Sequence, residues 1–143
     1  MATIPADVRA VIESGRLAHM VTVNRDGSPQ VTCVWVGIEG DEIVAGHLAE
    51  QQKIRNLRRD SRSVLSMETD VMNPIGLQEY LVVHGRVRIE EGGAPELLQR
   101  LAHRYLGPAV TFPPMENPPA GYVTHFVPER YGGIGPWAGR PAE

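Results

Sequence analysis

The sequence predicts a mainly β protein of the α+β class, folded as a small closed or half-open antiparallel barrel with short flanking helices. Six segments rich in β-branched and alternating apolar residues are separated by turn signals. The helical segments between them do not follow a strict β-α-β alternation, which separates the chain from parallel α/β folds. The 143 residues have the length of one domain, and we expect 1–143 to form a single domain.

The N-terminal third is expected to hold one helix and three strands. Pro5 stands where a first helical turn favours proline, and Val8 and Ile12 follow at helical spacing. Asp26-Gly27 is a hairpin turn signal. The expected elements are a helix over Ala6–Ser14 and strands over Leu17–Asn24, Pro29–Ile38 and Glu42–His47. We expect the three strands to form an antiparallel meander.

The rest of the chain is expected to hold two helices and three strands. The second of these helices has Leu97, Leu98 and Leu101 on its inner face. The expected elements are helices over Glu50–Arg59 and Ala94–Leu106, and strands over Ser63–Thr69, Glu79–Glu90 and Gly121–Tyr131. The connections are a loop over Asp70–Gln78, an irregular segment over Gly107–Ala120, and a Gly/Pro-rich tail from Gly132 that contains Trp137.

Composition excludes several classes of protein. A formal net charge of −3 argues against a general nucleic-acid binder. No apolar run has membrane-spanning length, and the N-terminus lacks a signal-peptide layout. A lone cysteine, Cys33, excludes an internal disulfide and fits a reducing cytoplasm. No Gly-x-Gly-x-x-Gly follows a strand, which argues against a Rossmann site.

The most informative segment is a cationic block over Lys53–Arg62, called here the basic segment. It holds the only lysine of the chain and five of its fourteen Lys and Arg residues. It lies at a strand-to-helix transition, where free backbone N–H groups and the positive end of the helix dipole favour a phosphate. A solvated basic helix face is the alternative interpretation.

No set of side chains forms a convincing catalytic group. The five histidines are far apart in sequence, so we expect no metal site, and no paired carboxylates or serine nucleophile motif stand out. Cys33 lies on a predicted strand among apolar residues, where an inert core thiol is expected. An anion site without acid/base machinery favours redox chemistry carried by a cofactor. The catalytic residues therefore stay unknown.

Five segments resemble one family, the flavin and deazaflavin (coenzyme F-420) dependent oxidoreductases of the pyridoxamine 5'-phosphate oxidase-like superfamily. They include two parts of a first hairpin with its Asp-Gly turn and the strand that follows it. The basic segment is similar to the "KxxNLrrDpR" pattern of the family and is the most specific of the five. The segments are Leu17–Val23, Asp26–Val31, Val34–Val36, Lys53–Arg62 and Val82–Val87. The resemblance is strongest to the actinobacterial branch that uses F-420.

The resemblance implies a six-stranded split β-barrel of the FMN-binding type and a homodimer, with the cofactor in a groove at the dimer interface. It implies that Lys53 holds the cofactor phosphate with help from Arg55 and Asn56. Tyr80 from the partner subunit would border the ring, and Trp137 would wall the substrate side. The implied cofactor-binding residues are Gln30, Thr32, Cys33, Gly46, His47, Lys53, Arg55, Asn56, Tyr80 and Trp137. Of these, Gln30, Thr32 and Cys33 would line the ring, and Gly46 and His47 would approach the phosphate or its chain.

The function implied is hydride transfer from reduced F-420 to a small organic acceptor, in a cytoplasmic oxidoreductase. Tyr80 and His47 are candidate proton donors. Glu50 and Gln51 stand where FMN-binding relatives often have Arg or Ser, which favours F-420 over FMN. The alternatives are an FMN-dependent oxidase or flavin reductase of the same fold, a non-catalytic module that binds flavin or heme, and a binder of nucleic acid or acidic partners. The last is disfavoured because no aromatic residues interleave with the arginines.

Overall fold

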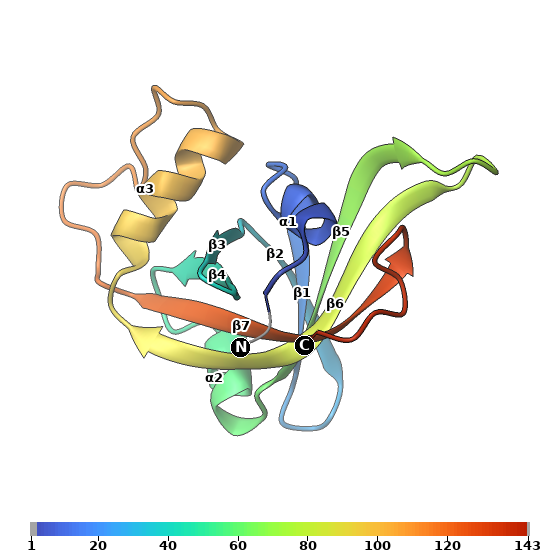
Figure 1. Cartoon of the computed structure of the whole chain (residues 1–143). Helices are drawn as coiled ribbons and strands as arrows, with labels where there is room; N and C mark the ends of the chain where they lie inside the picture. The colour runs from blue at the N-terminus through green and yellow to red at the C-terminus, as the bar shows by residue number, and fades with distance from the viewer. Residues whose placement is uncertain (1–2, 143) are drawn as a thin grey trace.

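The structure is a computed structural model that describes residues 3–142, and these form one antiparallel sheet of seven strands with three helices (Figure 1). The strands are β1 (Ala18–Val23), β2 (Pro29–Val34), β3 (Gly37–Glu39), β4 (Glu42–His47), β5 (Arg62–Met72), β6 (Gln78–Glu91) and β7 (Tyr122–Ile134). The helices are α1 (Ala6–Ile12), α2 (Gln52–Arg59) and α3 (Ala94–Tyr105). No helix of the described part is long and apolar enough to cross a membrane.

The strand order is β2-β1-β5-β6-β7-β4-β3, and the curled sheet does not close. This confirms the predicted antiparallel split barrel, with seven strands in place of six. The expected meander is wrong in its third strand, because β4 pairs with β7 and not with β2. The strand expected over Pro29–Ile38 is divided at Trp35-Val36, where the backbone N–H of Val36 donates to the Tyr105 hydroxyl at 3.1 Å. The chain thus leaves one edge of the sheet and enters the other edge as β3.

Two strands run further than the sequence indicated. The loop expected over Asp70–Gln78 is shorter in the structure, because residues 70–72 belong to β5 and Gln78 to β6, which leaves a turn over residues 73–77. β7 continues through Gly132 and Gly133, which were expected to end it. Gly133 has a φ of 94°, and a Cβ there would lie 2.3 Å from the Tyr80 carbonyl oxygen. Glycine therefore extends this strand, since only a residue without a side chain fits against β6.

The core lies on the inner face of the sheet, and α1 packs against it. Val8 and Ile12 of α1 join Met20, Leu65 and Phe126 in the largest cluster of buried apolar residues. A second cluster lies under α3, where its leucines meet β4 and β7. Trp137, expected in an exposed tail, is 3% exposed and belongs to the main core. Its segment folds back, so the indole is covered by the chain itself.

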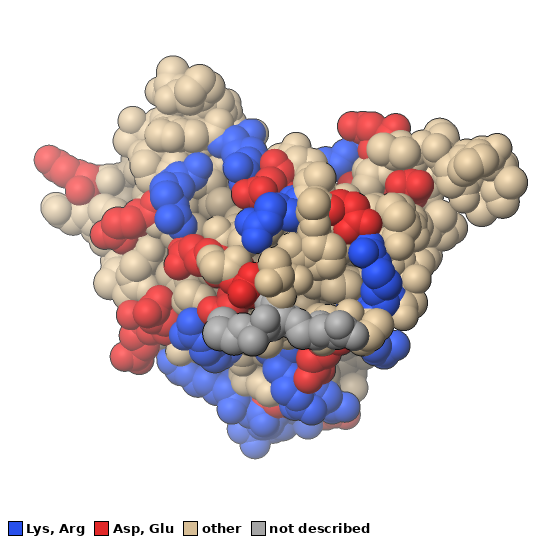
Figure 2. All heavy atoms as spheres, viewed as in Figure 1, with Lys and Arg blue, Asp and Glu red and all other residues tan. Residues whose placement is uncertain are grey.

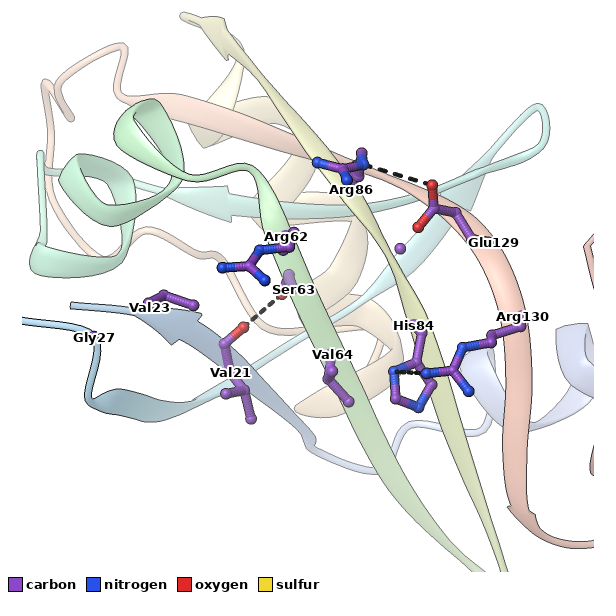
Figure 3. A pocket seen from close by; sticks show the side chains of 11 residues that line it. Val21, Val23, Gly27, Arg62, Ser63, Val64, His84, Arg86, Glu129 and Arg130 are labelled. Carbon is purple, nitrogen blue, oxygen red and sulfur yellow. Dashed lines mark hydrogen bonds and ion pairs between the residues drawn. The ribbon is translucent and has the colours of Figure 1, made fainter. Parts of the chain in front are cut away.

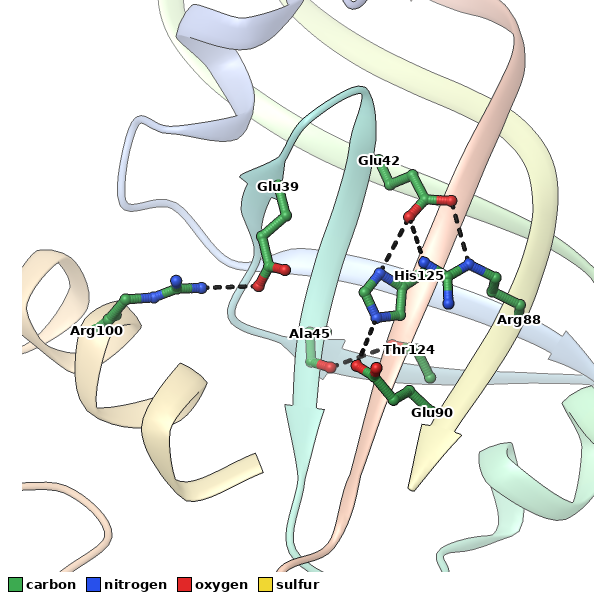
Figure 4. Close-up of polar contacts among 8 residues, drawn as sticks. All are labelled: Glu39, Glu42, Ala45, Arg88, Glu90, Arg100, Thr124 and His125. Carbon is green, nitrogen blue, oxygen red and sulfur yellow. Dashed lines mark hydrogen bonds and ion pairs between the residues drawn. The ribbon is translucent and has the colours of Figure 1, made fainter. Parts of the chain in front are cut away.

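A histidine on β7 joins three strands (Figure 4). The ring of the buried His125 lies between two carboxylates, with Nδ1 3.1 Å from Glu42 Oε1 of β4 and Nε2 3.1 Å from Glu90 Oε1 of β6. Arg88 of β6 also contacts both carboxylate oxygens of Glu42, at 3.3 and 2.8 Å. The contact of His125 Nε2 with Glu90 is a hydrogen bond, whereas Nδ1 lies close to Glu42 without forming a hydrogen bond to any described residue. Arg100 of α3 adds a contact to Glu39 at 2.9 Å.

Candidate functional site

The basic segment forms α2 and the start of β5, at the end of the molecule that carries the β1–β2 turn. Figure 2 shows Lys and Arg side chains gathered at the lower end of the view, where Figure 1 places α2. The helix begins after Gln51, whose backbone is extended and which makes no side-chain cap. Its first-turn N–H groups therefore lack a capping side chain. α2 packs beside β1 and the end of β6.

Lys53 is a buried cation without an acid partner. Its side chain lies in the first turn of α2, and the residue is only 7% exposed. The ammonium Nζ lies 3.4 Å from Thr32 Oγ1 of β2, and no carboxylate of residues 3–142 lies within 4 Å of it. Burial lowers the pKa of Lys53, because the charged ammonium loses its hydration. A buried ammonium with one weak neutral contact is a group that an anion stabilises.

His47 lies near Lys53 at the end of β4 and carries no charge. Burial and the Lys53 charge lower the pKa of His47 to about 3, so the ring is neutral at physiological pH. Nε2 lies 2.9 Å from Thr124 Oγ1. The Thr124 hydroxyl donates to the Ala45 carbonyl at 3.4 Å, which leaves its oxygen to accept from His47 and favours the tautomer protonated on Nε2. His47 thus adds no second cation.

Asn56 holds α2 against the first hairpin. Its side chain is fully buried, and its amide nitrogen lies 3.0 Å from Thr22 Oγ1, 2.9 Å from Asn24 Oδ1 and 3.4 Å from Gln30 Oε1. Its amide oxygen accepts from the Gln52 side chain at 2.8 Å. Because these bonds join the helix to β1 and β2, they fix the position of Lys53 relative to Thr32. An open hollow of about 590 Å³ adjoins this network and is lined by Asn24, Arg25, Asp26, Gln30 and Gln52.

The remaining charges of the helix are exposed and already have partners. Arg55 donates to the Glu50 carbonyl and to the Gln52 side chain, both at 2.9 Å, and stays along the first turn of its own helix. Arg58 contacts the Glu50 carboxylate at 2.6 Å. The negative charge of Glu50 is therefore countered by an arginine of the same helix, and Lys53 is the buried cation of α2 that has no acid partner.

The structure brings together six of the ten predicted residues and places the other four in distinct surroundings. Gln30, Thr32, Cys33, His47, Lys53 and Asn56 lie around the start of α2. Arg55 is turned along the helix, and Gly46 lies under α3, where a Cβ would come within 3.0 Å of Leu98. Trp137 donates a hydrogen bond to the Tyr80 carbonyl at 3.3 Å, near the start of β6. Arg58 of α2 approaches Glu91 at the other end of β6, so Tyr80 and Trp137 lie away from α2. All ten cofactor-binding roles stay predictions.

Cys33 is exposed on the edge strand β2, so the expected core thiol is wrong. The alternation along β2 places Val31 and Cys33 on the outer side, with Val31 58% exposed. Sequence reasoning also missed Thr22 and Asn24, which complete the Asn56 network. Thr22 could have been found, because it stands in the same alternation as the inward Ala18 and Met20 of β1 and is a hydroxyl at a core position.

The fold agrees with comparisons to known proteins. Residues 4–132 match the family described as pyridoxamine 5'-phosphate oxidase. The chain belongs to this family. The pyridoxamine 5'-phosphate oxidase-like family binds flavin and includes oxidoreductases. No protein of curated function matches the sequence at a significant level.

Solved structures place the chain in the same superfamily. An F-420 reductase is 25% identical with a TM-score of 0.69, and the alignment covers 90% of this chain and 98% of the reductase. HupZ of Group A Streptococcus is 17% identical with a TM-score of 0.65, covering 99% of this chain and 100% of HupZ. A pyridoxamine 5'-phosphate oxidase homologue from Listeria innocua is 17% identical with a TM-score of 0.65, covering 90% and 95%. The last two share the fold with this chain.

Proposed function

We propose that this chain is an oxidoreductase that uses reduced coenzyme F-420 to deliver a hydride to a small organic acceptor. One observation carries the proposal: Lys53 is a buried ammonium without a carboxylate partner, in the first turn of a helix. Such a position suits a phosphate, because the helix start and the ammonium attract the same anion. The similarity to an F-420 reductase supports the choice of cofactor.

The residues present fit the anionic end of such a cofactor. Lys53 would bind the phosphate, and the Thr32 hydroxyl would donate a second hydrogen bond to it. Asn56 would hold α2 against the β1–β2 hairpin on either side of the phosphate. When bound, the deazaflavin supplies the hydride, and the chain supplies position and electrostatics. Gln30, which lies on the same face of β2 as Thr32, would border the ring, and Cys33 would border it from the exposed side of the same strand.

Proton delivery would come from Tyr80 or from water in preference to His47. Because the pKa of His47 is lowered to about 3, its ring holds no second proton to donate at neutral pH. The buried Nε2 of His47 contacts the Thr124 hydroxyl. Because the ring is neutral, it places no second positive charge beside Lys53. The Tyr80 hydroxyl belongs to an exposed residue and is free to meet a second subunit.

The assembly that we propose is a cytoplasmic homodimer in which the partner subunit's Tyr80 borders the ring. Two features support this arrangement. β2 is an edge strand that exposes Val31 and Cys33, and such edges pair or are covered in stable proteins. The lone thiol suits a reducing compartment.

FMN is the second candidate cofactor, because the family whose model matches the chain binds flavin. The two cofactors are distinguished by titrating the protein with F-420 and with FMN while following intrinsic tryptophan fluorescence. We expect saturable binding of F-420 that is at least about tenfold tighter than that of FMN. Oxidation of reduced F-420 is then measured against a panel of electron-poor alkenes. Tighter binding of FMN would replace the proposal by a flavin oxidase or flavin reductase, and binding of neither would refute it.

A further inference from the structure

A second hollow, lined by several basic side chains, lies on the outer face of the sheet (Figure 3). Its volume is about 440 Å³, within the range of sites for small molecules. One part of its wall is apolar and comes from Val21, Val23 and Val64. The other part carries the basic side chains Arg62, His84, Arg86 and Arg130, with a single carboxylate from Glu129. β1, β5, β6 and β7 all contribute, so the hollow is built by the sheet and not by a mobile loop.

The strand register sets two arginines opposite one another in this hollow. Arg62 of β5 pairs directly with Arg86 of β6, and Arg130 of β7 lies opposite His84 of β6. Like charges directly opposite each other destabilise a sheet, by an amount on the order of 0.2–1 kcal/mol for each pair. Sheet stability alone therefore does not account for Arg62 facing Arg86. A bound anion would offset the repulsion between the two guanidinium groups.

A β-bulge directs two consecutive residues of β7 into the hollow. The β6–β7 register shifts between His84 and Gly85, which face Arg130 and Pro128, so Glu129 is the extra residue. In a regular strand, neighbours point to opposite faces, whereas here both Glu129 and Arg130 line the same hollow. Gly85 fixes this geometry, because a Cβ there would lie 2.2 Å from the Val127 carbonyl oxygen.

The charges of the hollow do not balance. Asp60 binds Arg62 through two contacts, at 3.0 and 2.7 Å. Glu129 holds Arg86 more loosely, at 3.6 Å. Arg130 meets no carboxylate of residues 3–142 within 4 Å, and its Nη2 lies 3.4 Å from His84 Nδ1.

Burial and the charge of Arg130 lower the pKa of His84, so the ring is neutral and its Nδ1 accepts from the guanidinium. His84 therefore orients Arg130 without adding to its charge. One unpaired guanidinium and one loosely held guanidinium remain beside an apolar wall, and guanidinium forks match the oxygens of phosphate and carboxylate groups.

We propose that this hollow binds a small organic anion whose phosphate or carboxylate lies against Arg86 and Arg130 and whose apolar part lies on the three valines. The site is distinct from the one at Lys53. Thr22 of β1 points to Asn56 of α2, whereas Val21, next to it in the strand, points into the hollow. The two sites therefore lie on opposite faces of β1.

Labelling of arginines with phenylglyoxal, followed by peptide mass spectrometry, locates the anion directly. Inorganic pyrophosphate is the phosphate probe and citrate is the carboxylate probe. We expect one of them to protect Arg86 and Arg130 from labelling at a concentration that leaves Arg100 of α3 unprotected. Protection by pyrophosphate alone identifies a phosphate site, and protection by citrate alone identifies a carboxylate site. Labelling that neither anion changes overturns the proposal, as does an Arg130 that a second copy of the chain shields before any anion is added.

Calorimetric titration of variants with the protecting anion completes the test. Arg130→Gln should weaken binding at this site about tenfold, because one charge-assisted contact is lost. Arg100→Gln is the matched control, since Arg100 is an exposed arginine paired with Glu39 at 2.9 Å, and it should leave the affinity unchanged. Lys53→Met should also leave this binding intact, so a failure of the cofactor proposal does not affect it. Equal affinity in Arg130→Gln and Arg100→Gln, or loss of binding in Lys53→Met, would show that the hollow is not the site.

Discussion

Replacement of Lys53 by methionine should weaken anion binding and also stabilise the ligand-free protein. Methionine has a similar length and no charge, so the change removes the ammonium and little of the volume. A hydrogen bond to a charged group contributes about 1.5–3 kcal/mol, which corresponds to a loss of roughly 10- to 150-fold in affinity for the cofactor. Arg58→Met is the control, because Arg58 is half-exposed on the same helix and already binds Glu50 at 2.6 Å. We expect it to change the affinity by less than about threefold.

The stability of the same variant provides an independent measurement. Since Lys53 is buried without an acid partner, its removal should stabilise the ligand-free protein by on the order of 1 kcal/mol, or roughly 2–4 °C in Tm. The effect should depend on pH. Burial lowers the pKa of Lys53 in the folded state. There is therefore a pH range, below the ordinary lysine pKa of about 10.4, in which Lys53 is protonated in the unfolded chain but not in the folded protein.

Folding stability of the wild type should therefore rise with pH through that window, and Lys53→Met should flatten the rise. Affinity is measured by titration with F-420 and FMN, and stability by thermal unfolding between about pH 7 and pH 10. A variant that binds within a factor of about two of the wild type would refute the assignment of Lys53 to the phosphate. A variant that is less stable than the wild type without ligand would refute the claim that the ammonium lacks a partner.

Three further changes test the structure around the sites. Asn56→Leu should cost about 2–3 kcal/mol in urea unfolding, because buried groups of the β1–β2 hairpin lose their donor, and a cost below about 1 kcal/mol would contradict the network. His125→Ala should lower stability by about 2–3 kcal/mol in thermal unfolding, since it leaves a cavity between two carboxylates, and an unchanged Tm would show that the contacts to β4 and β6 contribute nothing. Gly133→Ala should cost more than about 2 kcal/mol and Gly76→Ala only about 1 kcal/mol in the same measurement, because both have positive φ but only Gly133 meets a neighbouring backbone. Equal costs for the two glycines would contradict the close approach of β7 to β6.

Local patterns predicted the elements that depend on neighbouring residues. The Asp26-Gly27 turn joins two antiparallel strands as expected, although the second strand ends at Val34 and not at Ile38. α2 and α3 lie within two residues of their predicted bounds. The split barrel and the family resemblance are both confirmed. In each case the signal is local: a turn dipeptide, a helical spacing, or a short motif such as the basic segment.

The misses come from interactions between distant parts of the chain. The place of β4 beside β7 depends on pairing across about eighty residues, which no local pattern encodes. The exposure of Cys33 depends on which face of β2 turns inward, and a shift of one residue reverses it. Trp137 was expected in solvent because its segment is rich in glycine and proline, yet that composition lets the segment fold back over the core.

The hydrogen bonding of β7 gives this chain an unusual order of assembly. β3 and β4 form a hairpin early in the sequence, yet their link to the main sheet is β7, the last strand of the described residues. During synthesis from the N-terminus, the β3–β4 hairpin must therefore wait for more than seventy further residues before it gains its second neighbour. Until then the edges of β4 and β6 that pair with β7 have no hydrogen-bonded neighbour, and unpaired strand edges promote aggregation. α3 contacts β4 in the folded protein and precedes β7 in the sequence, so it is the helix that is available to cover this hairpin first.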